Sequence, residues 1–506
     1  MSVNIYSATH QGLDGVLINV EVDIGRGIPI FHIVGLAEAS VKEAKERVRA
    51  AIINTGYDFP LGRITVNLAP ADVKKRGALL DLPIAIGILM ASKQIQYKRL
   101  DDYLIFGELS LNGDLKPVKG ALPIMIEGHE ENKDNFILPF GNVKEIISYS
   151  IGNVYPFNSL KEVIDFITNE DLLPYENNDL QIIKNTCKND FAEIIGQRVA
   201  KRAMEIVAAG RHNIYMFGSP GVGKTMLANA LPSILPSLTK KEEMEVAKIY
   251  SSAGLGKEFE KIEIPFRAPH HSITKSALIG GGNDITLGEI TLAHNGVLFL
   301  DEILEYKRDI LELLRKPLEE GTITITRLHE RYILPSNFLL VACSNPCPCG
   351  RWMNLEGKKC ECSEMEIHKY INKLSTAIID RIDLLCYIPR VRPEEVLKDN
   401  AEYTSNAMKK RVMTALEIQK VRFKNTNYRY NSEIAGSDIY KLCNISPKAK
   451  RILEKCYRDY AISLRGYGKL VKVARTMADL DGEEQIREEQ IIEALGYRKN
   501  IFGEIV

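Results

Sequence analysis

Apolar and polar residues alternate in blocks along the first part of the chain. Short β-rich stretches such as GVLINVEVDI (15–24) and RITVNLAP (63–70) are separated by stretches with helical character such as EASVKEAKERVRAAIINTG (38–56). This alternation predicts an α/β or α+β domain over residues 1–170. The next residues, 171–190, are polar and contain few apolar side chains, so we interpret them as a linker.

A second series of strand-like apolar stretches runs through residues 191–392. It includes NIYMF, GVLFLDE, TITIT, RYILP and FLLVACS, which lie among segments with helical character. We therefore expect a second α/β domain there. From residue 393 to residue 506 the strand patterns disappear, and the chain is helical and locally basic.

Length, charge and the lengths of the apolar runs narrow the class of protein. A chain of 506 residues is too long for a single core and predicts roughly two to four domains. Lys and Arg (66) balance Asp and Glu (66), so contact with nucleic acid must come from local patches. The N-terminus lacks a secretory signal, and the longest apolar run, residues 82–91, reaches about half of the roughly 20 residues that span a bilayer. These features predict a cytoplasmic protein without a membrane segment.

The stretch that follows NIYMF has the spacing of a phosphate-binding loop, G-x-x-x-x-G-K-T, between a strand and a helix. Backbone N–H groups of such a loop surround phosphates, the lysine reaches the β- and γ-phosphates, and the threonine binds Mg²⁺. We therefore expect ATP and Mg²⁺ as cofactors. The predicted ATP-binding residues are Gly218, Ser219, Pro220, Gly221, Val222, Gly223, Lys224, Thr225 and Met226.

Hydrolysis needs further groups at neighbouring strand ends. Asp301 and Glu302 follow the apolar stretch GVLFL, and we assign Asp301 to Mg²⁺ and Glu302 to activation of the attacking water. Asn345 ends the stretch FLLVACSN and is expected to position that water. Arg381 follows STAIID, and we expect it to act as an arginine finger if it faces the ATP of a neighbouring subunit.

Several longer stretches carry a resemblance to a known family. They are RAPHHSITKSALIGGGNDITLGEITLAHNGVLFLDEI, SNPCPCG, DRIDL and, with one extra valine, KLVKVARTMADL. Together they closely resemble the magnesium-chelatase-like ComM (YifB) family of bacterial AAA+ ATPases, over essentially the whole chain. The resemblance implies an N-terminal Lon-protease-like (S5-like) domain, a central AAA+ P-loop ATPase module and a C-terminal all-helical lid. It also implies a homo-hexameric ring that acts as a DNA branch-migration helicase in natural transformation.

The N-terminal domain lacks the residues of a Ser-Lys protease. Gly77 is followed by Ala78, Leu79 and Leu80, none of which carries a hydroxyl group. The helix expected after Gly120 reads ALPIMIE and offers no lysine as a base. We therefore predict a protease-like shell without protease activity.

The family pattern also implies a basic ATP sensor in the lid segment SLRGYGKLVKVARTMADL. Relatives carry arginine where this chain has Lys469. We choose Arg475 as the ATP-contacting residue, with Lys472 and Arg465 as alternatives.

Two inserts between the nucleotide motifs are candidates for contact with DNA. The stretch TITITRLHERYIL alternates with period two on both sides of Leu328-His329-Glu330, which predicts a hairpin. Ring helicases related to the minichromosome maintenance proteins project hairpins from these two places into their channel. That resemblance nominates Lys275, Arg327, His329 and Arg331 as DNA-binding residues that contact phosphates without reading sequence.

Five of the nine cysteines lie between residues 343 and 362. Cys347, Cys349, Cys360 and Cys362 form two C-x-C pairs, which predict a structural zinc site, with free thiols or a redox role as alternatives. Cys343 lies inside an apolar stretch and is expected in the core. His270 and His271 are adjacent in an extended segment, so we expect their rings on opposite faces and no shared ion.

The sequence thus predicts an ATP-driven, ring-forming motor that binds single-stranded or branched DNA. Two alternatives stay open: a chelatase-type ATPase subunit, and an ATPase that remodels a partner other than DNA. Stimulation of ATP hydrolysis by DNA would separate the motor from both.

Overall fold

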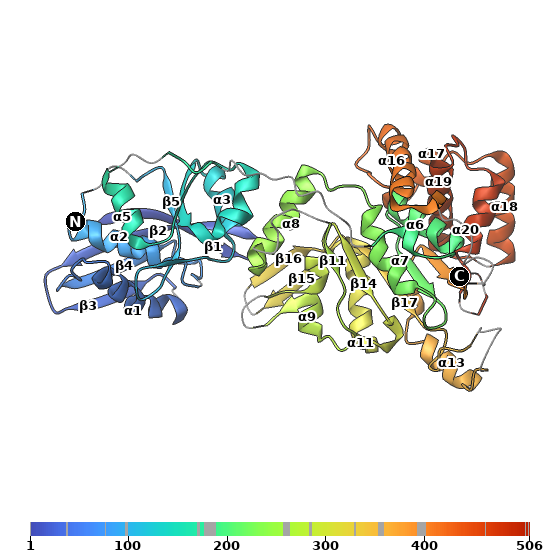
Figure 1. Ribbon diagram of the computed structural model, residues 1–506, viewed down its shortest axis with the longest axis horizontal. Helices are drawn as coiled ribbons and strands as arrows, with labels where there is room; N and C mark the ends of the chain where they lie inside the picture. The colour runs from blue at the N-terminus through green and yellow to red at the C-terminus, as the bar shows by residue number, and fades with distance from the viewer. Residues whose placement is uncertain are drawn as a thin grey trace. The chain divides into compact units, whose positions relative to one another are not determined.

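The computed structural model describes residues 2–36, 39–75, 77–96, 100–169, 173–176, 189–256, 264–282, 286–327, 330–352, 359–391, 401–460, 462–500, 502–503 and 505. The chain forms two compact units (Figure 1). The first contains Met1–Ile183 and Lys240–Glu263, and the second contains Lys184–Thr239 and Ile264–Val506.

The first unit is built on a four-stranded sheet with the order β1-β2-β4-β3 and a three-stranded parallel sheet with the order β5-β8-β9. In the larger sheet only the β3–β4 pair is parallel. A short ribbon, β6-β7, completes the strands. The strands are β1 (Val3–Gln11), β2 (Asp14–Gly25), β3 (Ile30–Val34), β4 (Arg63–Ala69), β5 (Tyr103–Ile105), β6 (Glu108–Leu109), β7 (Leu115–Lys116), β8 (Asn135–Pro139) and β9 (Asn153–Phe157).

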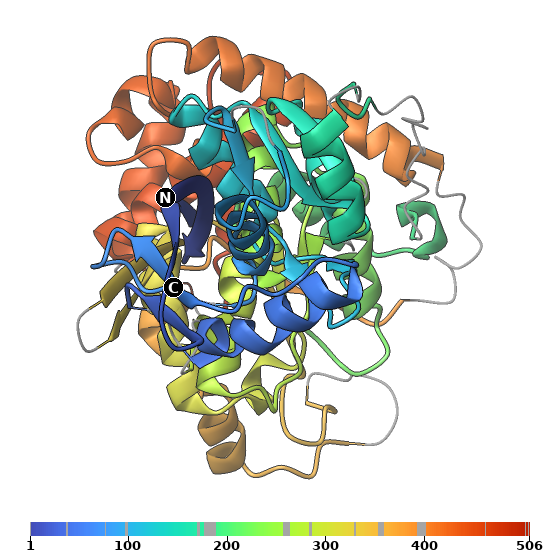
Figure 2. The same ribbon diagram turned by 90° about the vertical axis from the view of Figure 1, so that its left-hand side faces the viewer.

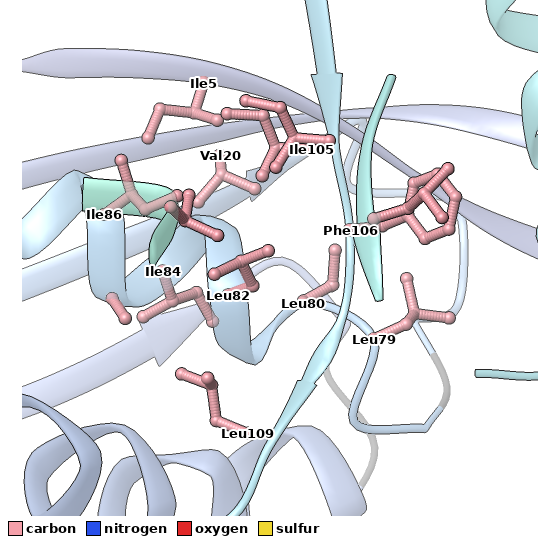
Figure 3. Packing of buried hydrophobic residues seen from close by; sticks show 14 of the residues in the cluster. Ile5, Val20, Leu79, Leu80, Leu82, Ile84, Ile86, Ile105, Phe106 and Leu109 are labelled. Atoms are coloured by element: carbon pink, nitrogen blue, oxygen red, sulfur yellow. The ribbon is translucent and has the colours of Figure 1, made fainter. Parts of the chain in front are cut away.

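Helix α2 (Asp81–Ala91) is the centre of this unit because nearly every side chain on it is apolar and buried. Figure 3 shows Leu82, Ile84 and Ile86 of α2 among Ile5 and Val20, which come from β1 and β2. The alternation of buried and exposed positions in these strands directs one face of each toward the helix. The remaining helices encoded before residue 170 are α1 (Ala39–Asn54), α3 (Ala121–Glu130), α4 (Val143–Ile146) and α5 (Leu160–Asn169).

Helix α8 (Lys240–Ala253) belongs to the first unit although it is encoded after the phosphate loop. Ala247 and Met244 of this helix pack against the hydrophobic core of this unit, and Ser251 contacts the start of α3. The backbone N–H of Gly120 donates to the Ser251 carbonyl oxygen (2.9 Å), and the N–H of Leu122 donates to the Ser251 hydroxyl (3.1 Å). An N–H group at the start of α3 that no helical carbonyl satisfies thus finds its acceptor on α8. The predicted domain boundaries place α8 in the second domain, residues 191–392, whereas the structure places it in the first unit.

The second unit contains a five-stranded parallel sheet with the order β11-β14-β17-β10-β18. Its inner strands are buried on both faces, which explains their almost continuously apolar sequences. The strands are β10 (Ile214–Phe217), β11 (Phe266–Arg267), β14 (Val297–Leu300), β17 (Leu339–Ser344) and β18 (Leu384–Tyr387). The helices encoded with them are α6 (Arg198–Gly210), α7 (Lys224–Ala230), α9 (Lys275–Ile279), α10 (Glu289–Leu292), α11 (Arg308–Leu311), α12 (Arg315–Glu320), α13 (Glu364–Ile371) and α14 (Thr376–Ile379).

Two antiparallel ribbons and a helical segment complete this unit. β12 (Gly280–Gly281) pairs with β13 (Thr286–Leu287), and β15 (Thr322–Arg327) pairs with β16 (Glu330–Pro335). The second ribbon confirms the predicted hairpin. The C-terminal helices are α16 (Ser405–Arg422), α17 (Asp438–Leu442), α18 (Pro447–Asp459), α19 (Leu464–Leu480) and α20 (Glu488–Gly496).

The structure confirms the predicted mixed α/β fold with a helical C-terminal segment (Figures 1 and 2). Figure 2 turns the first unit, coloured blue to teal, toward the viewer. The expected β-rich stretches 15–24 and 63–70 form β2 and β4, and the expected helix 38–56 forms α1.

Candidate ATPase site

The large sheet brings three predicted motifs to one edge. The phosphate loop follows β10, the acid pair follows β14, and Asn345 follows β17. β17 lies between β10 and β14 and is parallel to both. Because the carboxyl ends of parallel strands meet at the same edge, the three motifs lie together there.

The phosphate loop has the backbone geometry that its glycines permit. Gly221 (φ 78°) and Gly223 (φ 95°) adopt left-handed conformations that other residues rarely adopt. The Lys224 Nζ atom donates to the carbonyl oxygens of Gly218 (2.6 Å) and Ser219 (2.9 Å), which holds the ammonium in the centre of the loop. Burial lowers the pKa of Lys224, and neighbouring acidic groups partly offset this effect.

The predicted magnesium ligands are in direct contact. The Thr225 hydroxyl donates to Oδ2 of Asp301 (3.1 Å), and the other carboxylate oxygen, Oδ1, accepts the backbone N–H of Glu302 (2.9 Å). Glu302 has a φ of 49° and an exposed side chain beside the phosphate loop. The Cys343 thiol also donates to Oδ1 of Asp301 (2.9 Å). Cys343 is fully buried as predicted, but its contact with the acid pair was not predicted, because an apolar stretch does not reveal which side chain lies opposite.

Asn345 contacts the phosphate loop through its side chain. Its Oδ1 atom accepts a hydrogen bond from Lys224 Nζ (3.3 Å). The preceding residue, Ser344, is held by the Tyr215 hydroxyl (2.6 Å) and accepts the N–H of Gly218 at its carbonyl oxygen (3.3 Å). The end of β17 is therefore fixed to β10 immediately before Asn345.

Gln197 is a contact of the phosphate loop that sequence reasoning missed. Its Nε2 atom donates to the carbonyl oxygens of Val222 (3.1 Å) and Pro389 (2.7 Å), so it joins the loop to the chain that follows β18. A single glutamine before a helix is too common a feature to indicate this role. Met226 lies on α7, and its side chain is 49% exposed.

Arg381 lies at the amino ends of the parallel strands, whereas the phosphate loop lies at their carboxyl ends. It precedes β18, and its carbonyl oxygen accepts a hydrogen bond from Asn213, which precedes the parallel strand β10 (3.4 Å). Its guanidinium donates to the Ala377 carbonyl oxygen (2.6 Å) and pairs with Glu319. The strand β10 is four residues long and spans roughly 13 Å between its two ends. Arg381 is thus directed away from the phosphate loop of its own chain.

A cavity of about 1140 Å³ lies beside Arg381 and is lined by basic and acidic side chains. Arg465 pairs with Glu319 (2.6 Å), and Lys469 pairs with the buried Asp383 (2.9 Å). Burial opposes ionisation of Asp383, but the Lys469 ammonium lowers its pKa to about 2. Burial lowers the pKa of Lys469 to about 8, although Asp383 acts in the other direction. Both groups are therefore charged at pH 7.

The predicted ATP contact of Arg475 does not fit the structure. Its side chain is fully buried in the C-terminal helical segment, where it bonds to Asp479 (2.9 Å) and to the carbonyl oxygens of Glu483 and Glu484 (2.6 and 2.8 Å). The guanidinium thus fixes the turn after α19. The alternative Lys472 donates to the Ser432 carbonyl oxygen (2.6 Å).

The predicted DNA-binding residues lie on the two inserts. Lys275 begins α9 and forms an exposed ion pair with Asp309 (2.9 Å). Arg331 is exposed on β16, and the backbone of Arg327 ends β15. His329 lies outside the described residues.

The expectation that His270 and His271 face opposite directions is wrong. Their ring centroids are 4.0 Å apart, because the chain turns at this point instead of continuing as a strand. His270 Nδ1 is bonded to the Ser272 hydroxyl (2.8 Å).

The four predicted zinc ligands converge. Their sulfur atoms all lie within 4.8 Å of one another, and they form the potential metal-binding group found among the described residues. Desolvation opposes ionisation of Cys349, but hydrogen bonds from the Arg351 backbone and the Cys347 thiol lower its pKa to about 6. A lowered pKa favours the thiolate, the form that binds metals. The four residues are Cys347, Cys349, Cys360 and Cys362.

Three family models match three successive parts of the chain. The family described as "Magnesium chelatase, subunit ChlI" matches residues 190–396. "Subunit ChlI of Mg-chelatase" matches residues 20–142, and "Magnesium chelatase, subunit ChlI C-terminal" matches residues 402–498. In the described part of the chain, no helix combines the length and the apolar composition needed to cross a membrane.

Two relatives are similar over nearly their full length. Competence protein ComM of Haemophilus influenzae is 40% identical over 504 residues, which cover 98% of this chain and 97% of that protein. The uncharacterized protein YifB of Salmonella typhimurium is 38% identical over 499 residues, which cover 98% and 96%. A Holliday junction branch migration complex subunit RuvB of Fusobacterium nucleatum is 25% identical over 155 residues, or 29% of this chain and 37% of that protein.

The site and the family matches define an ATPase of the magnesium-chelatase-like AAA+ class, for which ATP and Mg²⁺ are the implied cofactors. Within that class the similarity to ComM and YifB extends over almost every residue. The chain belongs to the ComM (YifB) family, as its motifs predict.

Proposed function

We propose that this chain is a ring-forming, ATP-driven DNA motor that acts as a branch-migration helicase in natural transformation and recombination. One observation carries the proposal: the phosphate loop and Arg381 lie at opposite edges of the same sheet. One subunit cannot apply both to one nucleotide, so a second copy must supply the arginine. A hexameric ring satisfies this need at every site. The relatives named as a competence protein and a branch-migration subunit support the assignment to DNA.

Each residue of the site has a proposed role. Thr225 and Asp301 hold Mg²⁺, which neutralises charge on the phosphates. Lys224 binds the β- and γ-phosphates, Asn345 orients the attacking water, and Glu302 accepts its proton. The contact between Lys224 and Asn345 supports this arrangement, because it brings the water-orienting amide to the phosphate-binding ammonium.

We propose DNA contacts on the two inserts, through Lys275, Arg327, His329 and Arg331. The exposed position of Arg331 on the β15–β16 hairpin supports a contact with phosphates. Such contacts do not depend on sequence and weaken with salt.

The N-terminal unit is proposed to be a Lon-protease-like shell without protease activity. Residues 78–80 carry no hydroxyl group, and Asp81, which follows them, is bonded to Arg47 (2.7 Å). Casein cleavage that persists in the Lys224→Ala protein would contradict this proposal.

The cysteine cluster is proposed to hold a structural zinc ion, with four protein ligands and no open position. A chelatase-type role is the second candidate function, because the matching family is named for magnesium chelatase. A motor that remodels a partner other than DNA is the third.

DNA-dependent ATP hydrolysis distinguishes these candidates. We expect single-stranded or forked DNA to stimulate hydrolysis by the wild-type protein, and Lys224→Ala to abolish it. Arg331→Ala should lower the stimulation and reduce the salt slope of DNA binding by about one. Lys420→Ala, which removes an exposed lysine of α16 that pairs with Glu417 (3.7 Å), is the matched control. Hydrolysis that is indifferent to DNA would favour one of the other two functions.

A further inference from the structure

The sulfur atoms of the cysteine cluster have the spacing of a tetrahedral metal site. Three separations are 3.4 Å (Cys347–Cys349), 3.5 Å (Cys349–Cys360) and 3.7 Å (Cys347–Cys360). A tetrahedron with Zn–S distances of about 2.3 Å has edges of about 3.8 Å. The backbone N–H of Trp352 points at Cys347 Sγ (3.3 Å), as expected for a group that orients a metal ligand.

The loop that carries these cysteines packs against the phosphate loop. Gly350 has a φ of 72°, and a Cβ atom on it would lie 2.7 Å from Cγ and Cδ of Pro220. The same atom would lie 4.0 Å from Cγ of Asn345. Only a residue without a side chain fits this approach, so the cysteine loop forms a wall of the phosphate loop.

The loop is also anchored on its other side. Cys362 is followed by Ser363, which caps α13 in a reciprocal capping box with Glu366. The Phe502 ring stacks on His368 of α13 (4.5 Å between centroids) and lies 5.5 Å from Trp352. A metal ion would therefore join two fixed points: α13 on one side, and the segment Asn345–Cys347 on the other.

We propose that metal bound at the cysteine cluster clamps Pro220 and Asn345, so that metal occupancy and nucleotide binding are thermodynamically coupled. The proposal rests on the proposed nucleotide site but not on hydrolysis or DNA. Coupling of this kind is reciprocal: zinc should tighten binding of MgADP, and MgADP should tighten binding of zinc by the same factor.

Trp352 offers a direct probe because it is the single tryptophan of the chain and contacts Cys347. Zinc content and tryptophan fluorescence are measured on the full-length protein before and after treatment with a chelator selective for zinc over magnesium. We expect about one zinc per chain and a fluorescence change when MgADP binds. Removing zinc should weaken MgADP binding by about 5- to 150-fold, and added zinc should restore it.

Three variants separate the clamp from general stability. Cys360→Ser should lose zinc and bind MgADP weakly. Gly350→Ala should keep zinc but bind MgADP weakly, because its methyl group pushes Pro220 away. Gly482→Ala is the matched control: Gly482 has nearly the same φ, 73°, and nothing within 4 Å of its Cβ position, so zinc and MgADP binding should stay at wild-type levels.

Three results would overturn the proposal: purified protein with well under one zinc per chain, stripped protein with unchanged MgADP affinity, or Gly350→Ala protein with wild-type affinity. If the clamp is present but the protein neither hydrolyses ATP nor responds to DNA, the proposed motor function fails while the coupling stands. If Cys360→Ser does not fold, the chelated wild-type protein and Gly350→Ala still decide the question.

Discussion

Glu319 binds two arginines at the edge of the sheet opposite the phosphate loop. Its carboxylate pairs with Arg381 and Arg465, and the hydrogen bond from Arg381 lowers the pKa of Glu319. The guanidinium of Arg381, which is proposed to reach the phosphates of a neighbouring subunit, is thus paired with a carboxylate of its own chain. Arg381 must exchange this carboxylate for phosphate before it can assist hydrolysis.

We therefore expect Glu319→Gln to raise the basal rate of ATP hydrolysis. The gain should be up to about fivefold, because an exposed ion pair contributes little in water. Arg381→Ala should instead lower the rate by roughly 10³-fold or more. The control is Glu320→Gln, which breaks only the pair with Lys316 (3.5 Å) on the same helix. A slower Glu319→Gln protein would mean that the carboxylate positions Arg381 for catalysis.

Residues of the phosphate loop could be predicted because their function follows from a local spacing. Gly221 and Gly223 lie inside the G-x-x-x-x-G-K-T motif, and both adopt the left-handed backbone conformations that the loop requires. The surroundings of Arg475 could not be predicted in this way. Arg475 and Lys469 lie on the same helix, but Arg475 is enclosed among the C-terminal residues whereas Lys469 pairs with Asp383, and this difference depends on tertiary packing.

At the scale of elements, α8 makes the first unit depend on a segment encoded after the phosphate loop. Ala247, which is 7% exposed, and Met244 pack against the core of the first unit. Burial of these two side chains contributes roughly 2 kcal/mol. Deleting residues 1–183 would expose this face to water.

We expect a chain that begins at residue 184 to aggregate or to lose soluble expression. The same truncation with Met244→Gln and Ala247→Ser should remain soluble and bind MgADP. Size-exclusion chromatography and nucleotide binding test both forms. A monodisperse truncated chain without the replacements would show that α8 does not need the first unit.

Strands and helices were predictable from periodicity because each follows from a repeat of two or of about 3.6 residues. The β15–β16 hairpin is one example, since its alternation is visible on both sides of the turn. The partner of an amphipathic helix is not contained in that repeat. The sequence of α8 does not reveal that the face with Met244, Ala247 and Ser251 packs against the first unit.

For the whole molecule, if Arg381 acts as proposed, a single subunit is an incomplete enzyme. In a ring, every active site lies between two copies, with the phosphate loop from one and the arginine from the next. Two inactive variants that lack different halves of the site can then complement each other. Lys224→Ala removes the phosphate-binding half, and Arg381→Ala removes the other half.

We expect each variant alone to be inactive and a 1:1 mixture to recover hydrolysis. In randomly mixed rings, about a quarter of the interfaces join an intact phosphate loop from an Arg381→Ala subunit to an intact arginine from a Lys224→Ala subunit. The mixture should therefore approach about a quarter of the wild-type rate. Mixing wild-type protein with the Lys224→Ala/Arg381→Ala double variant controls for subunit exchange, because with exchange the activity falls as the square of the wild-type fraction instead of in proportion to it. If exchange occurs and the two variants still do not complement, Arg381 does not act on a neighbouring subunit. The separation of Arg381 from the phosphate loop then no longer supports a ring.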